Sequence, residues 1–282
     1  MSAERRCDVC GSDAHSHLFD VNGFPVVRCR VCGLVFVGRT IGLDELIALY
    51  DESYYEDAVK PGYAGYGDAE QRKRHHDRTL LDQLESYRGP GDLLEIGCAY
   101  GYFLDEARQR GWRVRGIEPS AHAARHARER LGLEVSERQF PDVPAEPASQ
   151  DAIALWDVVE HLPNPRATLE HALVWLRPGG ILALSTGNVA SLTARIQGAD
   201  WSLMTPPWHQ FYFSRSTMGR LLADIGFQVI RWGGDGTVLV DPSAARPRIR
   251  GPLGALATQP AVTRVARRLG AGAVMFVFAQ KL

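Results

Sequence analysis

The chain has 282 residues, which is enough for one sizeable hydrophobic core and a small accessory module. No apolar stretch follows the charged opening MSAERR and none approaches the ~18 residues of a membrane span, so we expect a soluble, cytoplasmic protein without a signal peptide. The formal net charge is −1, yet seven basic and no acidic residues follow Asp241. Residues 1–241 therefore carry a net charge of −8, which argues against a broad nucleic-acid-binding surface.

Four of the five cysteines lie in two C-x2-C knuckles, each followed by a glycine. Such a knuckle bends back on itself and points both sulfurs at one centre, so two knuckles supply the four thiolates of a tetrahedral zinc site. The alternative, a pair of disulfides, is disfavoured by a reducing cytosol. We therefore predict a closed, structural Zn²⁺ site in a zinc-ribbon-like module over residues 1–38, with strands at "VVRC" and "LVFV". Its ligands are Cys7, Cys10, Cys29 and Cys32.

Residues 39–88 are rich in Tyr and Gly at first and then become helical in pattern, so we predict a helical cap or linker. Asp68 is placed to N-cap this helix. Its apolar face carries Leu80, Leu81, Leu84 and Tyr87.

Residues 89–282 alternate strand-like and helix-like segments. One helix is predicted to begin with Asn164 as its N-cap and Pro165 as its first residue. This alternation is typical of an α/β, Rossmann-like, doubly wound domain, here with a mostly parallel seven-stranded sheet and with insertions at 187–225 and 241–270 on the substrate side. The predicted strands are "LLEI", "WRVRGIE", "LEV", "DAIALW", "ILALST", "FQVIRW" and "AVMFVFAQKL".

The first of these strands runs into a turn with two glycines, Gly97 and Gly101, before a helix. A strand, Gly-rich turn and helix cradle a nucleotide-like ligand in doubly wound folds. Glu118, about twenty residues later, ends the second strand, where a carboxylate can accept from both hydroxyls of a ribose or else simply be solvated. Glu95 precedes the turn and would repel a diphosphate, which favours a cationic amino-acid moiety over a dinucleotide. Cys98 reads as a small buried residue rather than a nucleophile.

Five segments together resemble the class I S-adenosylmethionine-dependent methyltransferases over residues 89–282: E-I-G-C-x-x-G, "GIEPS", "DAIALWDVVEHLPNP", "LRPGGILALST" and "WHQFYFSRSTMGRLLADIGFQV". The resemblance implies S-adenosylmethionine as the co-substrate, with Glu95 near its ammonium group and Glu118 on its ribose. Pro119 would flank the adenine. The methionine part would be wrapped by Gly97, Cys98, Ala99 and Gly101, and lined beyond the fourth strand by Asp157 and Val158.

The N-terminal knuckles resemble a subset of this family that methylates sugars or other secondary metabolites and includes deoxysugar C-methyltransferases. This implies a small-molecule acceptor, and we expect methylation of a hydroxyl on a sugar, glycan or natural-product scaffold. His209 is our candidate general base, with a histidine packed among aromatic residues as the alternative. His161 is the second candidate, or else it orients the loop after the fourth strand. Glu160 reads as structural.

Other functions remain open at this point. The zinc module could be the nucleic-acid reader of an RNA methyltransferase, although the acidic body argues against it, and a non-catalytic protein could retain the cofactor fold. The basic C-terminal insertion has helical spacing with Arg264, Arg267 and Arg268 on one side. These arginines form either a solvated lid or a surface for an anionic acceptor, such as a nucleotide-linked sugar or a lipid-linked one on an anionic membrane.

Overall fold

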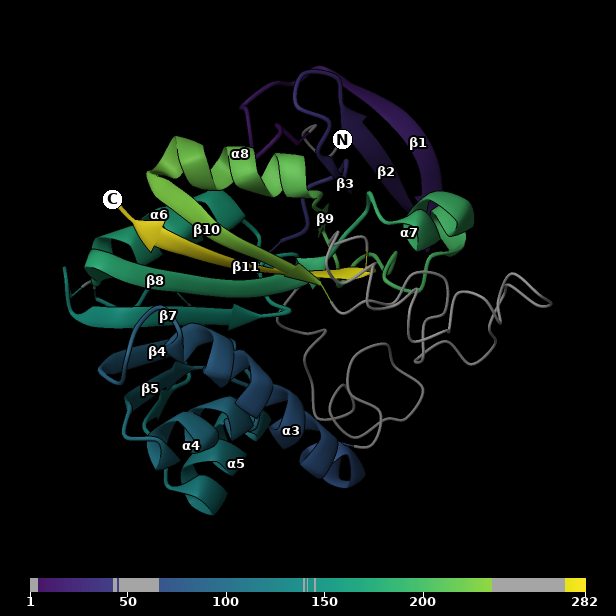
Figure 1. The fold of residues 1–282 in the computed structure, drawn as a ribbon. Helices are drawn as coiled ribbons and strands as arrows, with labels where there is room; N and C mark the ends of the chain where they lie inside the picture. Colours follow the sequence, from purple (N-terminus) through teal and green to yellow (C-terminus); the bar gives the residue numbers. More distant parts are fainter. Residues whose placement is uncertain are drawn as a thin grey trace, which may run out of the picture.

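A seven-stranded sheet forms the centre of the molecule (Figure 1). The structure is a computed structural model that describes residues 5–42, 45, 66–138, 140, 142–144, 146–234 and 272–282. The strand order is β10-β11-β8-β7-β4-β5-β6. β11 runs antiparallel to β10 and β8, and all other neighbouring pairs are parallel. This confirms the predicted Rossmann-like α/β class. The strands are β4 (Asp92–Ile96), β5 (Arg113–Ile117), β6 (Val135–Ser136), β7 (Gln150–Trp156), β8 (Leu176–Gly187), β10 (Phe227–Gly234) and β11 (Val274–Lys281).

Helices cover both faces of this sheet (Figure 1). Two separate hydrophobic clusters line the faces because the parallel strands are buried on both sides. On one face lie α3 (Tyr66–Glu85), α4 (Tyr102–Gln109) and α5 (Ala121–Leu131), and on the other α6 (Pro165–Trp175) and α8 (Arg215–Ile225).

The helix starts follow local capping chemistry. The Asn164 side chain accepts a hydrogen bond from the Ala167 amide at 2.9 Å, with Pro165 in the first turn, as predicted. The predicted start of α3 is wrong, because that helix begins at Tyr66 and Asp68 is therefore inside it. Once a helix is nucleated, each further residue adds a backbone hydrogen bond, so it extends past a possible cap.

A second, four-stranded antiparallel sheet contains the N-terminal module, with the order β1-β2-β3-β9. The first three strands are β1 (His15–Val21), β2 (Phe24–Cys29) and β3 (Val35–Val37), of which β1 was not predicted. The fourth, β9 (Phe211–Tyr212), comes from the segment after β8 and pairs with β3. Buried residues of the module, such as Phe36, join the same core cluster as the strands and helices of the central sheet. The module is thus built into the domain.

The segment between β8 and α8 packs over this module. It holds α7 (Leu192–Gln197) and a 3-10 turn, η2 (Gly198–Asp200). Trp201 and Met204 lie in a third buried cluster with valines of β2 and β3. The Tyr-rich stretch before α3 and the basic insertion before β11, including Arg264, Arg267 and Arg268, lie outside the described residues. None of the helices described is both long and apolar enough to cross a membrane.

Candidate active site and cysteine cluster

The turn between β4 and α4 requires its glycines. Gly97 has φ +72° and Gly101 has φ +82°, a conformation that L side chains rarely adopt. A Cβ atom on Gly97 would lie 2.5 Å from Cγ2 of Val158, so the turn after β7 lies directly against the Gly-rich turn. Ala99 also has a positive φ, +47°. The glycines therefore allow two loops to meet at the carboxyl ends of neighbouring strands, where ligands bind in open α/β sheets.

Glu118 ties the Gly-rich turn to the start of α5. It is buried at the end of β5, and its Oε2 accepts from the Ala99 amide at 2.9 Å while Oε1 accepts from the Ser120 amide at 2.8 Å. Each carboxylate oxygen thus holds one backbone amide, at opposite ends of the link between the turn and α5. Pro119 is exposed beside it.

Glu95 is a buried carboxyl whose Oε2 has no hydrogen-bond partner. Burial raises the pKa of Glu95 well above its ordinary value, with Asp77 and Glu118 adding to the rise and Lys73 opposing it. Asp77, on α3, is also fully buried, and Lys73 donates to one of its oxygens while the other has no partner. Asp77 lies close enough to act on the pKa of Glu95, and each carboxyl has one buried oxygen without a partner.

The buried carboxyl that α3 places beside Glu95 was not predicted from the sequence. The signal was present, because Asp77 lies three, four and seven residues before the leucines of the buried face of α3. An acidic residue on a face otherwise packed with leucine points to a polar partner in the interior.

The turn after β7 is fixed by a side-chain contact. The Ser185 hydroxyl accepts from the Asp157 amide at 2.8 Å and donates to Oδ1 of Asp157 at 2.7 Å. Asp157 has φ +54°, and Val158 after it contacts the Gly-rich turn. Cys98 is buried in that turn, and burial raises the pKa of its thiol well above the ordinary value. A thiol held protonated in this way is a packing residue rather than a nucleophile.

Two histidines meet beside this turn. The ring centroids of His161 and His209 are 4.5 Å apart, with the rings nearly perpendicular. Nδ1 of His161 lies 3.0 Å from the Trp208 carbonyl, and Nδ1 of His209 lies 2.8 Å from the Leu203 carbonyl. Because a carbonyl oxygen only accepts, each Nδ1 carries the hydrogen and each neutral ring keeps its lone pair on Nε2.

Burial keeps both imidazoles neutral. It lowers the pKa of His161 well below the ordinary value, with His209 adding to the effect, and lowers the pKa of His209 to about 4. Asp157 opposes the shift at His209, which places its carboxylate near that ring. The pair therefore lies between the turn after β7 and the segment that precedes β9.

Glu160 completes this group. Its ligand atoms and those of His161 and His209 all lie within 4.8 Å of one another. Burial, with Asp157 second, raises the pKa of Glu160 to about 8, so this carboxyl keeps its proton at neutral pH. The spacing would admit one cation, and a bound cation would favour loss of the Glu160 proton. Without a cation, the group consists of a protonated carboxyl and two neutral imidazoles.

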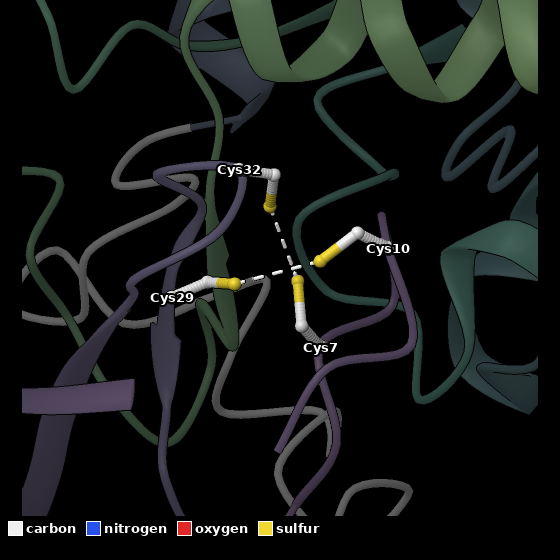
Figure 2. A group of neighbouring side chains, drawn as sticks. All are labelled: Cys7, Cys10, Cys29 and Cys32. Atoms are coloured by element: carbon white, nitrogen blue, oxygen red, sulfur yellow. Dashed lines mark hydrogen bonds between the residues drawn. The ribbon is translucent and has the colours of Figure 1, made fainter. Parts of the chain in front are cut away.

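The four cysteines of the two knuckles form the second group with ligand spacing (Figure 2). The Sγ atoms of Cys7 and Cys32 are 3.4 Å apart and those of Cys10 and Cys29 are 3.5 Å apart, and none is in a disulfide. A tetrahedral ion with Zn–S bonds of ~2.3 Å separates its sulfurs by only slightly more than this. Each knuckle turn closes with a backbone bond from Gly11 or Gly33 to the first cysteine.

The electrostatics of the cluster also fit a cation. Burial raises the pKa of Cys7, and it raises the pKa of Cys32 to about 11. At Cys29 burial acts in the same direction, but hydrogen bonds from the backbone amides of Cys32 and Val31 outweigh it and lower the pKa to about 7. The thiols of Cys7 and Cys32 become thiolates only beside a strong positive charge, which a bound metal ion supplies.

The comparisons with known proteins identify the family. A family profile described as "Methyltransferase domain" matches residues 69–231, more than half of the chain and including α3. The chain is 28% identical over 165 residues to a protein of Mycolicibacterium smegmatis named a probable S-adenosylmethionine-dependent methyltransferase, a match that spans 58% of this chain and 62% of that one. It is 28% identical over 169 residues to a ubiquinone biosynthesis O-methyltransferase of Azoarcus sp., spanning 55% of this chain and 72% of that one.

Solved structures share the fold. An S-adenosylmethionine-dependent methyltransferase of Thermotoga maritima, described as a possible histamine N-methyltransferase, has a TM-score of 0.53 at 19% identity and covers 77% of this chain and 94% of its own. The geranyl diphosphate C-methyltransferase of Streptomyces coelicolor A3(2) has a TM-score of 0.54 at 17% identity, and the match covers 80% of this chain and 85% of that one. With the profile match, these findings show that the chain belongs to the methyltransferase-domain family and carries a class I S-adenosylmethionine-dependent methyltransferase fold.

Proposed function

We propose that the protein transfers a methyl group from S-adenosylmethionine to a hydroxyl of a small molecule, such as a sugar, a glycan or a natural-product scaffold. The observation that carries this proposal is the half-buried pair of His161 and His209, both neutral with Nδ1 on a backbone carbonyl. With its hydrogen on Nδ1, the His209 ring has a basic Nε2 that can accept a proton beside the turn that contacts the Gly-rich loop.

The co-substrate would lie over the ends of β4, β5 and β7. S-adenosylmethionine, when bound, supplies a methyl group on a cationic sulfonium. Glu95 and Asp77 would face its ammonium group, because each has a buried oxygen without a partner. Glu118 would accept from the ribose hydroxyls, and Pro119 would flank the adenine. The methionine part would contact Gly97, Cys98, Ala99, Gly101, Asp157 and Val158.

The protein's own part in the reaction is positioning and proton acceptance. An acceptor hydroxyl held in line with the sulfonium would gain on the order of 7–11 kcal/mol from orientation. As the oxygen forms its bond to the methyl carbon and the S–CH3 bond breaks with its electrons on sulfur, Nε2 of His209 takes the hydroxyl proton. The products are the methyl ether, S-adenosylhomocysteine and a proton.

The basicity of the histidines favours a hydroxyl over a carbon acceptor. A hydroxyl becomes strongly acidic while its oxygen is being alkylated, so a weak base with a pKa of about 4 suffices. A proton on carbon must leave before the carbon can act as a nucleophile, and that needs a stronger base. We therefore prefer O-methylation to the C-methylation of a deoxysugar.

We also propose that the four-cysteine cluster holds one structural Zn²⁺. Four protein ligands leave no open coordination position, so the ion would stabilise the module and take no part in the chemistry. A phosphate-bearing acceptor, nucleotide-linked or lipid-linked, would suit the arginines of the basic insertion.

A screen for S-adenosylhomocysteine release tests the function. Wild-type protein should release it only with a hydroxyl-bearing acceptor from a panel of nucleotide sugars, glycans and phenolic scaffolds. His209→Gln should bind S-adenosylmethionine normally and fail to release the product. Release with an RNA acceptor, or transfer to carbon or nitrogen in the isolated product, would contradict the proposal.

A further inference from the structure

Gln210 lies between His209 and β9 and is completely buried. The amide and carbonyl of its backbone and both polar atoms of its side chain are hydrogen-bonded. We propose that Gln210 is a positioning residue through which the cysteine module holds His161 and His209 in place. The inference rests on the proposed function, in which these histidines serve the acceptor.

Two of the four hydrogen bonds lead to the module. Oε1 of Gln210 accepts from Nη1 of Arg5 at 2.9 Å, and its carbonyl accepts from the Val37 amide at 2.8 Å. Arg5 precedes Cys7 by two residues and is itself buried, with its guanidinium 4.2 Å from the ring centroid of Phe211 and a second bond to the Pro163 carbonyl. The module thus binds Gln210 through Arg5, beside the first knuckle, and through β3, which follows the second knuckle.

The other two bonds lead to the histidine loop. Nε2 of Gln210 donates to the carbonyl of His161 at 3.0 Å, and its backbone amide donates to the carbonyl of Glu160 at 2.9 Å. His161 in turn donates to the carbonyl of Trp208, in the segment that carries His209. One buried amide therefore fixes the turn after β7 against the segment before β9.

These contacts couple the position of the two knuckles to the position of the proposed proton acceptor, His209. β3 follows the second knuckle and pairs with β9, so a shift of the module moves Gln210 directly. If one partner moves, the Gln210 side chain loses its bond to that partner or to the other, and a buried polar group left without its bond is destabilising. A displacement of about 1 Å in a reacting group can cost about 10²-fold in rate.

Three substitutions separate the two ends of the link. Gln210→Ala removes both side-chain bonds. Gln210→Glu keeps an acceptor for Arg5 but replaces the donor that binds the His161 carbonyl. Arg5→Met removes the side-chain bond from the module, together with the bond to the Pro163 carbonyl, and leaves the Val37 bond in place. Arg166→Met is the matched control, since Arg166 also bonds the module, at the carbonyls of Asp8 and Val9, while its ion pairs are with Glu170 and Asp224.

The readout is the tautomer of each histidine in the full-length protein, followed by ¹⁵N NMR with selective histidine labelling. The parent and Arg166→Met should show a single Nδ1–H tautomer for His161 and His209. All three test variants should lose that single tautomer at His161 while their zinc content and folded spectrum persist. Once an acceptor is known, kcat should fall about 10²-fold with the affinity for S-adenosylmethionine unchanged.

An unchanged tautomer pattern in folded Gln210→Ala and Gln210→Glu would overturn the positioning role. An effect of the two Gln210 variants without one in Arg5→Met would overturn the link to the module. Neither result depends on catalysis, so failure of the proposed methyl transfer would appear separately, as wild-type protein that releases no S-adenosylhomocysteine while its histidines behave as expected.

Discussion

Replacing Glu118 by alanine should weaken S-adenosylmethionine binding more than any other single change at the cofactor site. The carboxylate already holds the amides of Ala99 and Ser120 at 2.9 and 2.8 Å. It would also accept from the two ribose hydroxyls. The substitution therefore removes the direct ligand contact and loosens the turn that wraps the methionine part.

The size of the effect follows from the number of bonds. A hydrogen bond to a charged group contributes about 1.5–3 kcal/mol, so losing two ribose bonds costs at least about 3 kcal/mol, or ~10²-fold in Kd. The buried amide of Ala99 adds to this, because it loses its acceptor. Glu118→Gln should fall between parent and alanine, since its carbonyl oxygen still accepts while its NH₂ group faces one of the backbone amides.

Isothermal titration calorimetry with S-adenosylmethionine measures the effect. Asp92→Asn is the control, because Asp92 lies at the other end of β4 and pairs with Arg113 and Arg177. The control should bind with the parent's affinity. If Glu118→Ala binds as tightly as the parent, the ribose assignment and the argument from the amide bonds are both wrong.

Further predictions concern the metal, the proton acceptor and the buried acid. Metal analysis of freshly purified protein should find one zinc per chain, and Cys10→Ser should lower the zinc content and the melting temperature; zinc-free native protein would contradict the assignment. His209→Gln should lower kcat by about 10²–10⁴-fold without changing cofactor affinity, and the parent rate should be flat from about pH 5.5 to 6.5, because the pKa of His209 is lowered to about 4 and that of Glu160 is raised to about 8. The pKa of Glu160 is raised from 4.5 to about 8, so its protonated form stabilises the fold fully below pH 4.5 and this stability is lost as the pH rises through 8. Urea unfolding of the parent should therefore lose about 2 kcal/mol more between pH 6 and 8 than that of Glu160→Gln, and parallel curves would refute the burial argument.

Local sequence patterns predicted much of the central sheet. Parallel strands such as β4, β7 and β8 are buried on both faces and therefore read as continuous apolar runs. The knuckles and the Asn164-Pro165 cap are likewise signalled within a few residues. The helix before the domain was found, although its start was placed three residues too late.

Features that depend on distant partners were not predictable in this way. β9 is two residues long and exists because β3 offers it a pairing edge. No residue of β1 is fully buried, so its sequence lacks a buried apolar face. Gln210 looks like any polar residue among aromatics, and its role depends on Arg5, 205 positions earlier. Pairings over such distances become visible only in the folded chain.

Equilibrium dialysis with radiolabelled S-adenosylmethionine tests the central claim most directly. The purified protein should bind one molecule per chain, in competition with S-adenosylhomocysteine and not with NAD, because the buried carboxyls of Glu95 and Asp77 favour an ammonium group and oppose a diphosphate. No binding, or displacement of the label by NAD at similar concentration, would contradict the account.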